Sequence, residues 1–203
     1  MNAKIESKHA VKPEHAPFLK LISRSASAML GMALLAVGLL LAVPCARAQT
    51  PVSLADTNFI LAAAQGGMTE VQLGELASTS GMRDDVKEFG RRMVKDHTAI
   101  NGDLKALAAQ KGVTLPDSLD AKHQAMVDKL TALTGSEFDD AYIKGMIKAH
   151  QKDARAFKAE AAATQDADIK SFLDKSLPVV EEHLQHITAM RKQLVSEPLR
   201  LLV

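Results

Sequence analysis

The chain has 203 residues, of which 25 are basic and 24 are acidic, and its formal net charge is +1. This balance excludes the strongly basic class of nucleic-acid-binding proteins, because a phosphate backbone is bound by clustered lysine and arginine side chains. Cys45 is the only cysteine, so no disulfide can form within the chain and its stability must come from packing.

Residues 1–48 have the organisation of a secretory signal peptide. Basic residues up to Arg24 precede an uncharged stretch of 19 residues, Ser25 to Val43, and the segment ends at Ala46-Arg47-Ala48. We therefore predict cleavage after Ala48 and a location in the periplasm or elsewhere in the cell envelope. The apolar stretch is also near the length that spans a bilayer, so a retained signal anchor is the alternative.

Cleavage would change the composition of the protein. Six of the 25 basic and two of the 24 acidic residues lie in residues 1–48, which leaves 19 basic and 22 acidic residues, a formal net charge of −3. The mature chain would have no thiol, and we expect neither a stable membrane span nor a nucleic-acid partner. A second copy of the chain and another envelope protein remain open as partners.

After a short linker at residues 49–55, the pattern is helical through residue 194. Apolar or small residues recur at alternating spacings of three and four from Phe59 to Ala77, from Val86 to Leu107 and from Ile169 to Leu194. This spacing is typical of helices that pack in a bundle.

A third long helix is predicted at about residues 136–164, and a shorter one at about residues 118–133. Short turns at Ser80-Gly81 and Thr164-Gln165-Asp166 predict two antiparallel hairpins. The predicted fold is therefore all-α, an up-and-down four-helix bundle with an extra short connector helix, followed by a tail at residues 195–203.

The helical spacing also predicts the core of this bundle. The side chains expected in the core are those of Phe59, Leu73, Phe89, Met93, Ile100, Leu104, Ile143, Met146, Phe157, Phe172, Val180, Leu184 and Ile187.

One short pattern, Met-Val/Ile-Lys-x-His, occurs twice, as Met93-Val94-Lys95-Asp96-His97 and as Met146-Ile147-Lys148-Ala149-His150. A histidine four residues after a methionine lies on the same helix face, one turn further along. Each copy therefore directs a thioether and an imidazole toward whatever the helix packs against, and both copies are candidate ligand pairs.

Each long helix carries one ionisable residue in its apolar register: Glu70, His97, His150 and His183. Metal sites in bundle cores use this arrangement. Folding the second hairpin brings His150 within about one helical turn of His183, whereas Glu70 and His97 are offset by about six residues, or roughly 9 Å. If these residues bind a transition metal, we expect His150 and His183 to be the nucleus of the site, His97 to join them, and Glu70 to be the ligand least favoured by spacing.

The expected metal depends on the ligands. Thioether with imidazole favours copper(I), whereas imidazole with carboxylate favours zinc, iron or copper(II). In a purely structural role, which is the leading interpretation, each histidine is neutral and hydrogen-bonded and Glu70 pairs with Arg91 or Arg92 across the first hairpin. The methionines are then core residues, and His123 and His186 are expected to be solvated.

Four groups of residues follow one another in a specific order. They are Gly66-Gly67-x-x-Glu70-Val71-x-Leu73-Gly74 within the run from Phe59 to Leu76, Met93-Val94-x-Asp96-His97 followed by Asn101 and Leu104, Phe138-x-x-x-Tyr142 followed by His150, and Leu177-Pro178 followed by His183-Leu184. In this order the chain resembles, over about Asp56 to Leu194, the exported bacterial proteins known as domain of unknown function 4142. The resemblance implies a ferritin-like four-helix bundle in a group often labelled as outer-membrane proteins, and it carries no settled activity.

The chain departs from the di-iron ferritins, which use Glu-x-x-His pairs. Three positions before His97, His150 and His183 the chain has Val94, Ile147 and Val180 in place of glutamate. Ferroxidase chemistry is therefore not expected. No nucleophile with its base, phosphate-binding loop or cofactor fingerprint is present, and an enzyme is not predicted. The leading prediction is a non-catalytic structural or stress-related envelope protein, with transition-metal binding as the alternative.

Overall fold

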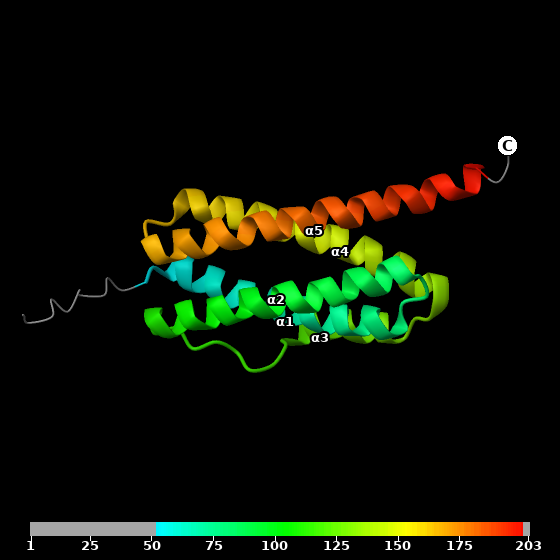
Figure 1. The fold of residues 1–203 in the computed structure, drawn as a ribbon. Helices are drawn as coiled ribbons and strands as arrows, with labels where there is room; N and C mark the ends of the chain where they lie inside the picture. Colours follow the sequence, from blue (N-terminus) through cyan, green and yellow to red (C-terminus); the bar gives the residue numbers. More distant parts are fainter. Residues whose placement is uncertain (1–51, 201–203) are drawn as a thin grey trace, which may run out of the picture. The chain divides into compact units, whose positions relative to one another are not determined.

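The structure is a computed structural model that describes residues 52–200. Over this range the chain forms five α-helices and no strand (Figure 1). The helices are α1 (Leu54–Ser80), α2 (Asp84–Lys111), α3 (Ala121–Thr131), α4 (Gly135–Ala163) and α5 (Ala167–Arg200). The predicted all-α bundle with a short connector helix, α3, is confirmed.

The four long helices form two hairpins, α1–α2 and α4–α5, which pack together through contacts of α2 with α5 and of α1 with α4 (Figure 1). The short helix α3 packs on α1 and α4. Asp139 on α4, which is 3% exposed, joins the hairpins. Its carboxylate accepts hydrogen bonds of 2.9 Å from the backbone N–H groups of Met82 and Arg83 in the α1–α2 turn.

The register of α1 against α2 is set where two glycines meet. A Cβ atom added to Gly90 would lie 2.7 Å from the carbonyl oxygen of Gly74, so the two backbones touch at this point. No larger residue fits there without moving main chain. At Gly67 the contact is different, because an added Cβ would meet the side chain of Asn101 rather than backbone.

The apolar core is divided into two clusters. The Phe157 cluster contains Phe59, Ile60, Ala64, Leu104, Leu107, Ala108, Ala154, Phe157, Ile169, Phe172, Leu173 and Val180. The Phe89 cluster contains Leu73, Ala77, Val86, Phe89, Met93, Leu130, Phe138, Tyr142, Ile143, Met146, Ile187 and Met190.

A buried polar layer lies between the two clusters. In each long helix the residues of one cluster give way to those of the other at a single buried ionisable side chain, namely Glu70, His97, His150 and His183. Of the thirteen predicted core residues, eleven are buried, and Ile100 and Leu184 are partly buried. The expected role of Met93, Met146 and Met190 as core residues is confirmed.

The helix ends differ from those expected. α1 begins at Leu54, inside the expected linker, because the Ser53 hydroxyl accepts a hydrogen bond of 3.0 Å from the Asp56 N–H and starts the helix. α5 runs to Arg200, so most of the expected tail is helical. The predicted signal peptide, residues 1–48, lies outside the described residues.

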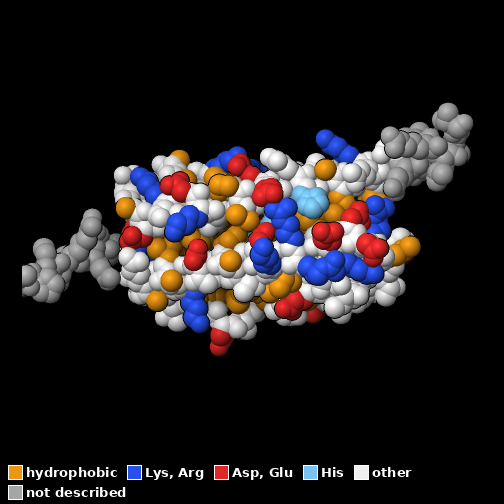
Figure 2. Space-filling view, in the orientation of Figure 1, with side chains coloured by type: hydrophobic (Ala, Val, Ile, Leu, Met, Phe, Trp, Pro, Cys, Tyr) orange, Lys and Arg blue, Asp and Glu red, His pale blue; other side chains and the backbone are white. Residues whose placement is uncertain are grey.

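Charges of both signs are interspersed on the face shown in Figure 2, without a continuous basic surface there. Within residues 52–200 no helix is both long and apolar enough to cross a membrane.

Two glycines on α2 should respond in opposite ways to alanine. We expect Gly90→Ala to lower the free energy of unfolding by roughly 1–2 kcal/mol, because overpacking against main chain outweighs the gain in helix propensity. Gly102 is exposed, and nothing lies within 4 Å of an added Cβ. Gly102→Ala should therefore raise the free energy of unfolding by up to about 1 kcal/mol in urea denaturation. Equal effects of the two changes would contradict the close packing of α1 on α2.

Candidate metal centre

Glu70 on α1 and His97 on α2 are in direct contact. Glu70 Oε2 lies 3.0 Å from His97 Nδ1, so the offset of roughly 9 Å predicted from sequence was wrong. The turn is centred nearer Met82, and the Gly74–Gly90 contact places Glu70 level with Val94. Each Cβ also leans toward the N-terminus of its own helix, which in an antiparallel pair moves these two side chains toward each other.

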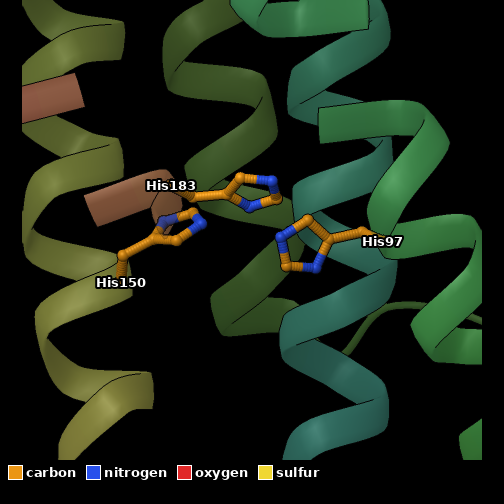
Figure 3. Close-up of side chains that lie close together, drawn as sticks. All are labelled: His97, His150 and His183. Atoms are coloured by element: carbon orange, nitrogen blue, oxygen red, sulfur yellow. The ribbon is translucent and has the colours of Figure 1, made fainter. Parts of the chain in front are cut away.

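The imidazoles of His97, His150 and His183 meet at the centre of the bundle, and we call them the histidine trio. Their ring centroids are 5.6 Å apart for His97 and His150, 5.2 Å for His97 and His183, and 5.5 Å for His150 and His183. One nitrogen of each ring lies within 4.8 Å of the other two. The rings come from three helices and point toward one another (Figure 3).

In each ring we call the nitrogen that faces away from the other two rings the outer nitrogen and the other one the inner nitrogen. Each outer nitrogen donates a hydrogen bond to an acceptor. The Nδ1–H of His97 donates to Glu70 at 3.0 Å, and the Nδ1–H of His150 donates to the main-chain carbonyl of Met146 at 3.0 Å. The Nε2–H of His183 donates to Asp96 Oδ2 at 2.9 Å. An outward N–H fixes the tautomer, so each neutral ring presents a lone pair on its inner nitrogen.

The inner nitrogens are buried and have no hydrogen-bond partner within the described part of the chain. They are Nε2 of His97, Nε2 of His150 and Nδ1 of His183. Leaving a buried acceptor unpaired costs about 1–3 kcal/mol. Three lone pairs that face one space repel one another, and a cation placed between them would satisfy all three at once.

Burial and neighbouring charges shift the pKa values of Glu70 and the trio histidines in different directions. Burial alone would raise the pKa of Glu70, but the neighbouring imidazoles lower it to about 2. Burial opposes charge on His97, and the Glu70 carboxylate nonetheless holds the pKa of His97 above its usual value. Burial lowers the pKa of His150, and it lowers that of His183 to about 4. A proton on His97 is therefore the natural competitor of a metal ion.

The structure gives Glu70 a place outside the trio. One carboxylate oxygen holds His97, the other lies 3.5 Å from His150 Nδ1, and Glu70 is not among the groups whose donor atoms converge. The expected pairing of Glu70 with Arg91 or Arg92 is wrong, because the charged partners of Glu70 are histidines, and Arg92 is bound to Asp96 at 3.3 Å and to Glu182 at 2.7 Å.

Asp96, whose carboxylate accepts the hydrogen bond from His183, was not predicted as a site residue. It directly precedes His97 in the first copy of the repeated pattern, and on a helix adjacent residues face different neighbours. Here His97 faces the core, whereas Asp96 reaches α5. The one available signal was the Arg92–Asp96 spacing, which indicates an ion pair and not its further contact with a histidine 87 residues away.

The two remaining histidines on the described helices lie outside the trio. His186 is exposed, as expected. His123 is partly buried, and its Nδ1 lies 2.8 Å from Asp120 Oδ1, the residue that caps the start of α3. The expectation that His123 is solvated was therefore wrong.

The family model described as domain of unknown function, DUF4142, matches residues 41–190. The chain belongs to this family. No curated protein matches the chain in sequence.

Solved structures share the fold at low sequence identity. A DUF305 fragment from Deinococcus radiodurans superposes with a TM-score of 0.63 and 11% identity, over 71% of this chain and 99% of that one. CopM, solved in a Cu(II)-bound form, superposes with a TM-score of 0.59 and 16% identity, over 68% of this chain and 97% of that one. CopM in the Cu(I)-bound form gives a TM-score of 0.58 at 16% identity, over 68% of this chain and 96% of that one. The likeness shows a shared helical fold.

The pKa shifts predict how stability depends on pH. Between pH 6.5 and about 4, His183 is protonated in the unfolded chain and neutral in the folded protein, so acid lowers the free energy of unfolding. We expect His183→Gln to remove this contribution, with a slope difference of up to about 1.4 kcal/mol per pH unit in urea denaturation without added metal. Burial raises the pKa values of Asp153 and Glu160 to about 7, so these two groups raise the free energy of unfolding in acid. They do so in the wild type and in His183→Gln alike, and their contributions cancel in the difference between the two slopes.

His97 and Glu70 do not interfere with this comparison. The raised pKa of His97 changes stability only above pH 6.5, and Glu70 changes it only between pH 4.5 and about 2. Identical slopes for the wild type and His183→Gln from pH 4.5 to 6.5 would show that His183 is not held neutral.

Proposed function

We propose that this protein binds a transition-metal ion through His97, His150 and His183, in a role without catalysis. The observation that carries this proposal is the set of three inner nitrogens, each buried and unpartnered, whose outer nitrogens are each fixed by an acceptor. Metal-ligating histidines are oriented in this way in proteins, with the second N–H donated to a carboxylate or a carbonyl.

Binding requires a small contraction of the trio. The ligand nitrogens lie within 4.8 Å of one another. Bonds of roughly 2.0–2.1 Å to one ion bring three nitrogens to separations of about 3.3–3.5 Å, which side-chain rotation can supply. The mature chain expected from sequence has no thiolate, so the ligand set is imidazole nitrogen, which suits copper, zinc and iron.

Copper is the first ion to test. CopM, a structural neighbour of this chain, is solved in Cu(I)-bound, Cu(II)-bound and silver-bound forms. The likeness in fold supports the choice of probe, whereas the ligand set rests on the histidine trio alone.

A purely structural role explains the trio less well. A buried polar layer stabilises a bundle only when its hydrogen bonds are satisfied, and well-packed apolar residues are otherwise as good or better. Here one nitrogen of each histidine is unsatisfied. We therefore favour transition-metal binding, the alternative expected from sequence, over the leading sequence-based prediction of a structural or stress-related role.

Removal of any trio histidine should abolish binding. We expect the wild type to bind about one copper, zinc or iron ion per chain, and His97→Ala, His150→Ala and His183→Ala to bind none, because two imidazoles leave the ion under-coordinated. Calorimetric titration and elemental analysis of the purified protein measure this. Binding should weaken as pH falls through roughly 6.5, since only neutral imidazole coordinates.

Two histidines outside the trio supply the controls. His123→Ala and His186→Ala should keep full binding, because neither ring reaches the trio. Absence of uptake by the wild type at micromolar copper, zinc and iron would end the proposal, and so would unchanged binding by His150→Ala.

The carboxylates that hold the outer nitrogens should tune affinity. We expect Glu70→Gln and Asp96→Asn each to weaken binding by about 10–100-fold with unchanged stoichiometry, because a neutral acceptor makes the imidazole a weaker ligand. Glu75→Gln is the matched control, since Glu75 is an exposed residue of α1. Equal affinities for Glu70→Gln and Glu75→Gln in competition titrations would show that Glu70 does not act through His97.

A further inference from the structure

A small cavity lies directly beside the polar layer. It has a volume of about 20 Å³, and its lining includes His97, Glu70, Asn101 and Asp153. This is room for about one water-sized species. Asn101 Oδ1 is buried without a hydrogen-bond partner among the described residues, so the cavity presents an unsatisfied oxygen next to two carboxyl groups.

A larger cavity of about 470 Å³ lies between α1, α3 and α4. Gly66, Glu70 and Asp153 line both the larger and the smaller cavity. Asp153 is partly exposed, whereas Glu70 is 6% exposed and His97 is 2% exposed. Asp153 and Glu70 therefore place acidic groups between the surface and His97.

Packing leaves room for a side chain at position 66, which is nevertheless a glycine. Nothing lies within 4 Å of a Cβ added to Gly66, whereas a Cβ on Gly67 would lie 2.0 Å from Asn101 Oδ1. Glycine inside a helix costs stability relative to alanine. Gly66 thus contributes no side chain to the boundary that the two cavities share.

We propose that the metal ion reaches the histidine trio through the opening framed by Gly66 and Asp153, and passes Glu70 before it meets His97. This inference rests on the proposed function, because it concerns how the same site is filled. A buried site needs such a path, since the trio histidines are 0–2% exposed. A second surface hollow, whose lining includes Arg92 and Asp96, shares no lining residue with the small cavity beside His97.

Basic side chains line the outer cavity and should regulate entry. Lys122, Lys148, Lys152 and Arg155 contribute to its lining. They repel a free cation at the rim, while Asp153 and Glu70 attract it further in. The rate of entry should therefore depend on charges of both signs that do not touch the bound ion.

Filling the opening should slow entry without changing affinity. With Co²⁺ as a coloured probe in stopped-flow absorbance, we expect Gly66→Leu to lower the association and dissociation rate constants together by about tenfold and to leave Kd unchanged. The matched control is Gly102→Leu on α2, where an added Cβ also meets nothing within 4 Å. It should bind Co²⁺ at the wild-type rate.

Charge variants test the same path without changing its shape. At pH 8, where Asp153 with its pKa of about 7 is ionised, Asp153→Asn should slow association several-fold, and the double variant Lys148→Gln, Lys152→Gln should accelerate it, both effects shrinking at high salt. Lys105→Gln on α2 should have no effect.

The outcomes separate this proposal from the proposed function. Normal Kd with wild-type rates in Gly66→Leu and in Asp153→Asn overturns the path and leaves the metal site standing. Failure of the wild-type protein to bind Co²⁺, copper, zinc or iron overturns both.

Discussion

A carboxylate buried at the centre of a helical bundle has to be compensated, and the Glu70–His97 hydrogen bond is the contact around which this bundle is arranged. Glu70 is 6% exposed, and without a positive or donating partner its charge would be strongly unfavourable. The partner is placed by the backbone contact between Gly74 and Gly90, which fixes the height of α1 against α2. Once His97 donates its Nδ1–H to Glu70, its other nitrogen must face the remaining helices.

The polar layer that results divides the core into two apolar clusters, and it makes the register of the bundle specific. A shift of one helix by a turn would move an ionisable side chain into an apolar cluster, where burial without its hydrogen-bond partner is unfavourable. The layer also reverses the arrangement of the di-iron ferritin-like proteins, whose carboxylates face the metal. Here Glu70 and Asp96 accept hydrogen bonds from His97 and His183, and the side chains that face inward are imidazoles.

Helix positions and their buried faces followed from local spacing, because a helix repeats every 3.6 residues whatever it packs against. The spacing of apolar residues therefore predicted eleven of thirteen core residues correctly. It also placed His97, His150 and His183 on the inner faces of their helices. Short turns likewise indicated the two hairpins. The end of α5 was misplaced because the apolar spacing stops at Leu194, whereas the helix continues to Arg200.

Tertiary structure decided what those inward residues do. The height of Glu70 against His97 depends on a turn centred nearer Met82 and on a glycine contact between two helices, neither of which a spacing pattern reveals. The acceptors of the outer nitrogens depend on main-chain and side-chain positions brought together from different helices, including Asp96, 87 residues before His183. The sequence by itself therefore determined which side chains point inward, because helix periodicity is local. Only the tertiary structure decided which nitrogen of each ring is left without a partner, because hydrogen-bond partners are set by packing between helices.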